Sequence, residues 1–286
     1  MSGGHEESQS GTCVFFSNPL MSDVEADWTP IHDAASNGRS LTLQRLIAQG
    51  ACVNLSTLDQ VSPLHGACAQ GHAACAKLLL QHGAHVNSET LDGRTALSEA
   101  CGRGHVTCVS LLLRHGARPL GSGSSDSPMH VAAAKGHPEC IESLAQHGAD
   151  LDQNVDQSGT PLHVACSNRQ LTAVKKLLQL GASVNMGRSG ESPLHVAVRA
   201  SSPEMVSVLL EHGADASMPN PEGKRPLDLA APASAVEKLR KQSAGVPQLM
   251  QLCRLHIRTT LGKSRLRSIT HLHLPTVLQN YLLWKA

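Results

Sequence analysis

One motif returns through most of the chain at an almost constant interval. Its clearest copy is Thr-Pro-Leu-His-Val-Ala at residues 160–165, followed by a leucine-rich segment that ends at Gly181. The second position of the motif recurs at spacings of 33, 33, 32, 33, 32 and 33 residues, and it is held by Pro30, Pro63, Ala96, Pro128, Pro161, Pro193 and Pro226. A fixed period near 33 residues predicts a stack of small repeated units rather than one closed globule.

Each unit carries the start and stop signals of two short helices. Thr or Ser before Pro favours a helix start, because the hydroxyl caps free backbone N–H groups and Pro at the first helical position has none to satisfy. The second helix is rich in leucine and ends at a glycine, which tolerates the left-handed cap. The remaining residues of each unit are turn-like. We therefore predict an all-α solenoid of helix–turn–helix units with hairpin connections between them.

Composition narrows the class of protein further. The chain has only five aromatic residues, and none lies between Trp28 and Tyr281, so the stacked layers are built from aliphatic side chains. The nine cysteines include no Cys-x-x-Cys pair, which favours reduced thiols. No apolar run reaches the length of a membrane span, and the N-terminus lacks the pattern of a signal peptide. We expect a cytoplasmic protein that binds no membrane.

The seventeen histidines do not form a recognisable catalytic or metal-binding pattern. Most of them recur with the repeat, for example His65, His163 and His195, which predicts a structural role in every layer through hydrogen bonds between neighbouring turns. Ligand spacings such as His-Glu-x-x-His are missing, as are phosphate loops and nucleophile elbows. The sequence therefore predicts a non-catalytic protein with no metal and no cofactor.

The repeated text resembles the ankyrin repeat, whose Thr-Pro-Leu-His-x-Ala signature is intact at residues 160–165 and nearly intact at residues 62–67 and 192–197. That resemblance implies a concave surface of hairpin tips and first helices on which a protein target binds. Mid-array cations there would suit an acidic patch on the target, although ordinary solvated residues are the alternative for any single position. The candidate target-binding residues are Phe15, Phe16, Trp28, Asn37, Asp59, Gln70, Arg94, Arg103, Asp126 and Lys135. Phe15 and Phe16 either pack on the first repeat or belong to an arm that grips the target.

The C-terminal segment has a different character. Residues 247–286 contain six Lys or Arg and no acid. Leu249, Cys253 and Ile257 are spaced to form one stripe of a helix, and Leu274-Pro275 follows. The basic residues are interleaved with apolar ones and have no aromatic platform beside them, which favours a protein partner over nucleic acid. A plain amphipathic helix that caps the last repeat is the alternative interpretation.

The order of these features resembles a suppressor-of-cytokine-signalling box, or SOCS box. In that family the Leu-x-x-x-Cys helix docks on elongin C, and a downstream Leu-Pro segment helps to select cullin-5. Val277 stands where the fuller Leu-Pro-x-Pro pattern has its second proline, so the cullin choice rests on the first. The resemblance implies an elongin-binding set of Leu249, Leu252, Cys253 and Ile257. It also implies a cullin-binding set of Leu274, Pro275, Leu278, Tyr281 and Leu282.

Repeats followed by this box resemble the ankyrin repeat and SOCS box proteins. We divide the chain into an N-terminal tail (1–26), six repeats with a degenerate capping unit (27–243) and a SOCS box (244–286). The resemblance implies a substrate-recognition subunit of a ubiquitin ligase that recruits elongin B and C, then cullin-5 with its RING subunit. It also points to a folded cytosolic enzyme, such as creatine kinase, as target. The alternative is an ankyrin scaffold or inhibitor without ligase recruitment.

Overall fold

The computed structural model describes residues 27–120, 127–155, 158–188, 190–230, 249–266, 269 and 274–283. Within them, six pairs of short helices are followed by a 3-10 turn and two further helices. The boundary placed between residues 243 and 244 lies outside the described part. The elements are α1 (Pro30–Ser36), α2 (Ser40–Ala48), α3 (Pro63–Ala69), α4 (Ala73–Gln81), α5 (Ala96–Arg103), α6 (Val106–Arg114), α7 (Pro128–Lys135), α8 (Pro138–Gln146), α9 (Pro161–Ser167), α10 (Leu171–Leu180), α11 (Pro193–Arg199), α12 (Pro203–Glu211), η1 (Pro226–Leu229), α14 (Leu249–Leu266) and α15 (Thr276–Leu283).

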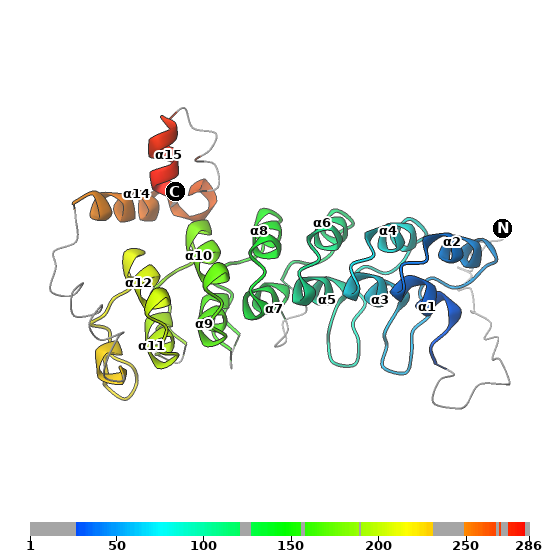
Figure 1. The fold of residues 1–286 in the computed structure, drawn as a ribbon, viewed down its shortest axis with the longest axis horizontal. Helices are drawn as coiled ribbons and strands as arrows, with labels where there is room; N and C mark the ends of the chain where they lie inside the picture. Colours follow the sequence, from blue (N-terminus) through cyan, green and yellow to red (C-terminus); the bar gives the residue numbers. More distant parts are fainter. Residues whose placement is uncertain are drawn as a thin grey trace, which may run out of the picture.

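The helix pairs stand side by side in one elongated row (Figure 1). The first helices of the pairs form one layer, namely α1, α3, α5, α7, α9 and α11. The second helices form the other layer, namely α2, α4, α6, α8, α10 and α12. In the described part of the seventh unit, η1 contacts α11. The layer of second helices is called the outer layer. The helices α14 and α15 lie next to it, beside α10 and α12 (Figure 1). The predicted all-α solenoid of paired helices is confirmed.

One apolar core runs the length of the stack from Ile31 to Leu209. Its largest members are aliphatic side chains with almost no exposure, such as Leu79, Leu112 and Leu177. Six buried cysteines fill the narrow places between layers as small apolar groups, namely Cys68, Cys75, Cys101, Cys108, Cys140 and Cys166. Each layer buries its surface on its neighbours, so the stability of a unit depends on the units beside it.

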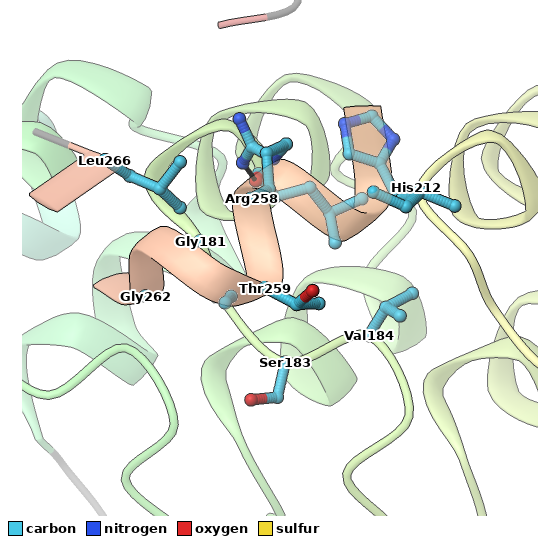
Figure 2. Close-up of a pocket in the computed structure, with 11 residues that line it drawn as sticks. Gly181, Ser183, Val184, His212, Arg258, Thr259, Gly262 and Leu266 are labelled. Carbon is cyan, nitrogen blue, oxygen red and sulfur yellow. Dashed lines mark hydrogen bonds between the residues drawn. The ribbon is translucent and has the colours of Figure 1, made fainter. Parts of the chain in front are cut away.

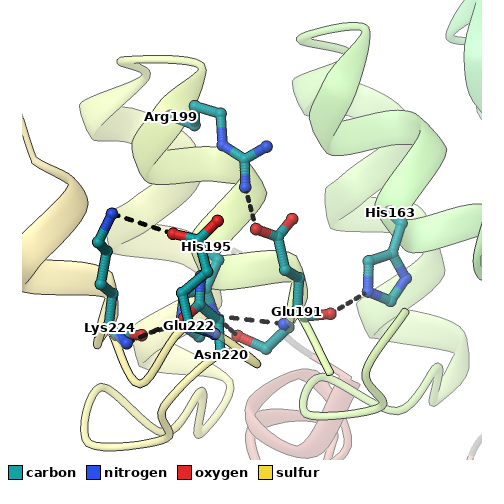
Figure 3. A network of polar contacts seen from close by, with 8 residues as sticks. His163, Glu191, His195, Arg199, Asn220, Glu222 and Lys224 are labelled. Carbon is teal, nitrogen blue, oxygen red and sulfur yellow. Dashed lines mark hydrogen bonds and ion pairs between the residues drawn. The ribbon is translucent and has the colours of Figure 1, made fainter. Parts of the chain in front are cut away.

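The histidines of the repeated motif tie each unit to the next one. His163 Nδ1 lies 3.2 Å from the backbone nitrogen of Thr160 and 2.8 Å from its hydroxyl. Because an amide N–H can only donate, Nδ1 must accept and Nε2 carries the proton. Nε2 donates to the carbonyl of Glu191 in the following hairpin at 3.0 Å (Figure 3). His65 and His195 make the corresponding contacts, with the carbonyls of Arg94 and Lys224. The predicted structural role of these histidines is confirmed.

This network predicts that acid weakens the stack. Burial lowers the pKa of His32, His65, His130 and His163 from its ordinary value. The unfolded chain therefore takes up protons below about pH 6.5, where the folded chain still resists them. The contribution of these neutral, buried histidines to the free energy of unfolding is fully present above that pH and is lost as the pH falls below it. We expect the urea midpoint of unfolding to decrease steadily from pH 7.5 to pH 5.0, and a constant midpoint would contradict the prediction.

Candidate functional site

The helix α14 presents two different faces. Cys253 and Ile257, four residues apart, are exposed, and 42% of Ile257 is open to solvent. On the other face, Leu255 is half-buried and only 8% of Arg258 is exposed. The backbone of Leu249 and Leu252 belongs to the same helix, whereas their side chains lie outside the described part. The structure thus places two of the predicted elongin-binding residues together on the outer face.

A kink divides α14 and allows the end of the chain to pack on itself. Gly262 adopts φ 69° and ψ 170°, which is not helical and suits a residue without a side chain. Beyond it, Leu266 and Ile269 are buried with Leu282 of α15 in a small apolar cluster, against which Leu274 also packs. Leu282, predicted as a cullin contact, therefore lies inside this cluster rather than on the surface.

The other predicted cullin-binding residues lie around α15. Pro275 and Leu278 are exposed, as is Val277, with 80% of its surface open. Tyr281 is half-buried, because the guanidinium of Arg254 stacks on its ring at 3.5 Å from the centroid. A cation over an aromatic face is an attractive contact that holds α14 and α15 together. The exposed part of α15 is consequently a short apolar strip centred on Val277 and Leu278.

The predicted target-binding residues that the structure describes lie in the first four units of the stack. Asn37 and Gln70 cap the ends of α1 and α3, and Arg103 and Lys135 end α5 and α7, all four exposed. Because α5 and α7 pack against each other, the cations Arg103 and Lys135 belong to adjacent units. This row along the ends of the first helices can take a charged partner.

The remaining candidates lie at or near the hairpins. Arg94 forms an ion pair of 2.8 Å with Glu99, so its charge is partly compensated. Asp59 is exposed at a hairpin tip, and its carbonyl accepts a hydrogen bond of 3.0 Å from the backbone of Leu91 in the next hairpin. Trp28 is 43% exposed, with its ring 5.0 Å from that of His32. Phe15, Phe16 and Asp126 lie outside the described residues.

Three further surface residues escaped the sequence interpretation. Leu58 and Leu91 are 83% and 64% exposed on consecutive hairpin tips, and their spacing of 33 residues could have revealed them. Arg169 continues the row of Arg103 and Lys135 in the fifth unit, where it takes φ 57° in the position that glycine holds in the first four units. Because Arg169 stands one residue after the repeat position of Arg103 and Lys135, the period of the repeat does not predict it.

Among the residues that the structure describes, no group of three or more His, Cys, Asp or Glu side chains is arranged to hold a metal ion. In the same residues, no helix is both long and apolar enough to cross a membrane.

Comparison with known proteins agrees with this geometry. Models described as ankyrin repeats match residues 9–90, 31–120, 86–155, 120–187 and 177–230, and the SOCS box model matches residues 245–283. Ankyrin repeat and SOCS box protein 9 of Mus musculus is 55% identical over 94% of this chain and 93% of its own length. The chain belongs to the ankyrin repeat and SOCS box protein family. Homo sapiens proteins 9 and 5 of the family are 54% and 55% identical, covering 93% and 91% of this chain and 91% and 79% of their own lengths.

Solved structures support the same assignment. The ankyrin repeat domain of human ASB11 superposes with a TM-score of 0.72 at 47% identity, covering 77% of this chain and 99% of that one. Residues 17–21 and 249–258 had suggested the ninth numbered member of the family, and protein 9 of mouse and of human are among the relatives found. Membership of the ankyrin repeat and SOCS box family implies an adaptor role rather than a catalytic one, and a SOCS box implies binding of elongin B, elongin C and cullin-5.

Proposed function

We propose that this protein is the substrate-recognition subunit of an elongin–cullin-5 RING ubiquitin ligase. The observation that carries the proposal is the exposed face of α14, where Cys253 and Ile257 are left uncovered inside a matched SOCS box. A helix that served only as a cap would turn its apolar stripe toward the last repeat. Here the opposite face contacts the stack, so the stripe is available to elongin C. In this proposal residues 27–243 hold the target and residues 244–286 form the box.

The mechanism is proximity. The stack would hold a target protein while the box recruits elongin B and C, then cullin-5 and the RING subunit that brings the charged ubiquitin-conjugating enzyme. Joining both partners to one chain raises the local concentration of target lysines near the ubiquitin thioester. The protein itself makes and breaks no bond. Leu274, Pro275 and Leu278 would contribute to the choice of cullin-5.

Co-purification of the full chain with elongin B and C, followed by addition of cullin-5 and its RING subunit, tests this function. A stable complex of all five proteins is the expected result. If elongin B and C fail to bind, the alternative of a non-catalytic ankyrin scaffold or inhibitor replaces the ligase. If elongin binds and cullin-5 does not, a different cullin is the partner.

The target-binding surface is proposed to be the row of Arg103, Lys135 and Arg169, with the hairpin tips beside it. These three exposed cations end or follow consecutive first helices, and no acidic group forms an ion pair with them in the described part of the chain. In the last units, by contrast, Arg199 pairs with Glu191 and Lys224 with Glu222 (Figure 3). Among the described cations at the ends of the first helices, those in the middle of the stack are therefore the ones whose charge is not paired. This unpaired positive charge suits an acidic patch on a folded enzyme such as creatine kinase.

Charge reversal tests this surface. A chain with Arg103→Glu and Lys135→Glu is expected to bind creatine kinase at least about tenfold more weakly at low salt, because two attractive contacts become repulsive. The matched control reverses Arg114 and Lys175, two exposed cations of the outer helices α6 and α10. Affinities from calorimetry at two salt concentrations supply the measurement. Equal losses in both chains would remove the row from the target surface.

A further inference from the structure

One arginine joins three parts of the molecule that are far apart in the sequence. Arg258 is 8% exposed on the inner face of α14. Its Nη1 donates to the carbonyl of Leu282 in α15 at 2.5 Å. Its Nη2 donates to the carbonyls of Leu178 and Gln179 in α10, at 2.7 Å and 3.1 Å. The side chain therefore bridges the box helices to each other and to the fifth repeat. Figure 2 shows Arg258 on α14 beside residues of the stack.

All three acceptors lie in the last turn of a helix. The final carbonyls of a helix have no N–H partner four residues ahead and carry partial negative charge. The helix α10 ends at Leu180 and α15 at Leu283, so a single guanidinium caps both ends at once. Its planar fork can direct separate N–H groups to separate acceptors, which a lysine ammonium on a flexible stem does less well.

The charge of Arg258 is kept in spite of its burial. Burial, with Arg254 nearby, lowers its pKa to about 10, so the side chain remains protonated at neutral pH. His212 of the last complete repeat lies in the same place, and burial, helped by the charges of Arg258 and Arg254, lowers its pKa to about 4. The imidazole is therefore neutral and adds no positive charge beside the guanidinium. Among the described residues, backbone carbonyls rather than a carboxylate compensate the charge of Arg258.

Apolar packing between the box and the stack is incomplete around this bridge. A cavity of about 290 Å³ lies between α14 and the fifth and sixth units. Its wall includes Ser183 and Val184 from the stack and Thr259 from α14 (Figure 2). A cavity deprives its lining of van der Waals contacts. The hydrogen bonds of Arg258 consequently do much to fix the orientation of α14 relative to α10.

We propose that Arg258 is a positioning residue that fixes the direction in which the SOCS box leaves the ankyrin stack. This inference rests on the proposed ligase function. In a ligase that acts by proximity, that direction determines which lysines of a bound target come near the ubiquitin thioester. Arg258 faces away from the exposed stripe of Cys253 and Ile257, so it acts through the geometry of the junction and leaves elongin binding to the other face.

Two variants and one control separate this role from a general loss of folding. Arg258→Met removes every donor and keeps a long stem, whereas Arg258→Lys keeps the charge and loses the fork. Arg265→Met removes an exposed cation from the same helix beyond the kink. All three chains are expected to co-purify with elongin B and C. Hydrogen exchange at the end of α10 and in α14 should be about tenfold faster or more in Arg258→Met, intermediate in Arg258→Lys and unchanged in the control.

The same complexes are then compared by small-angle scattering and by ubiquitin transfer to creatine kinase. Arg258→Met is expected to broaden the distribution of distances between stack and box and to change which target lysines are modified. Exchange and scattering like those of the unchanged chain would overturn the proposal. Failure of the unchanged chain to bind elongin would instead refute the ligase function. The exchange measurement on the protein alone would still decide whether Arg258 fixes the junction.

Discussion

A chain carrying Cys253→Phe is expected to lose at least about 30-fold in affinity for elongin B and C, which corresponds to roughly 2 kcal/mol. Cys253 is exposed in the isolated protein, so the larger ring does not disturb the stack or the box. In the proposed complex the small thiol of Cys253 enters a close-packed pocket on elongin C, and the larger ring would overfill that pocket. Combining it with Leu249→Ala should abolish the complex.

Cys253→Ala is the matched control for this result. Alanine is also small and apolar, so the variant should bind elongin nearly as well as the unchanged chain. Affinities from surface plasmon resonance, with thermal unfolding of each free chain alongside, give the comparison. Equal affinities of Cys253→Phe and Cys253→Ala would show that position 253 does not enter a pocket. The proposed docking of α14 on elongin C through Cys253 would then be wrong.

The sequence predicted the stack well because the signals of a repeat are local and repeated. Pro63 and Ser62 mark a helix start by their own chemistry, and the period then transfers that interpretation to every other unit. Even where the amino-acid sequence departs from the repeat, as at Asn168 and Arg169, the neighbouring units hold the backbone in the same turn, with Arg169 in the left-handed conformation. Units in contact with two neighbours have little freedom to adopt another conformation.

The site was less predictable because it depends on contacts between distant segments. Nothing in the local amino-acid sequence distinguishes Arg258 from the five other cations of residues 247–286, since its partners lie 24, 79 and 80 residues away. Leu282 was expected at a partner surface, yet the kink at Gly262 brings it into the cluster with Leu266. Arg94 was predicted to contact the target, yet its charge is paired with that of Glu99 in α5.

His163→Leu is expected to reduce the free energy of unfolding by about 3 kcal/mol. Leucine leaves the buried N–H of Thr160 without a partner, which costs roughly 1–3 kcal/mol. It also removes a hydrogen bond worth about 1 kcal/mol to the carbonyl of Glu191, which keeps the one from the backbone N–H of Arg188. The matched control is His115→Leu, because His115 is exposed at the end of α6 and its replacement should change stability by less than about 0.5 kcal/mol. Urea unfolding of the two chains at pH 7.5 provides the measurement, and equal midpoints would contradict the role of the network.

The consequence of His163→Leu should extend beyond its own unit. The fifth repeat supplies α10, whose last carbonyls hold Arg258 and with it the box. Since neighbouring units stabilise one another, loosening α9 also loosens α10. We therefore expect faster hydrogen exchange in α14 of this variant, whereas His65→Leu, the equivalent change three units away, should leave α14 protected. If both variants expose α14 equally, the junction depends on the whole stack rather than on the fifth repeat.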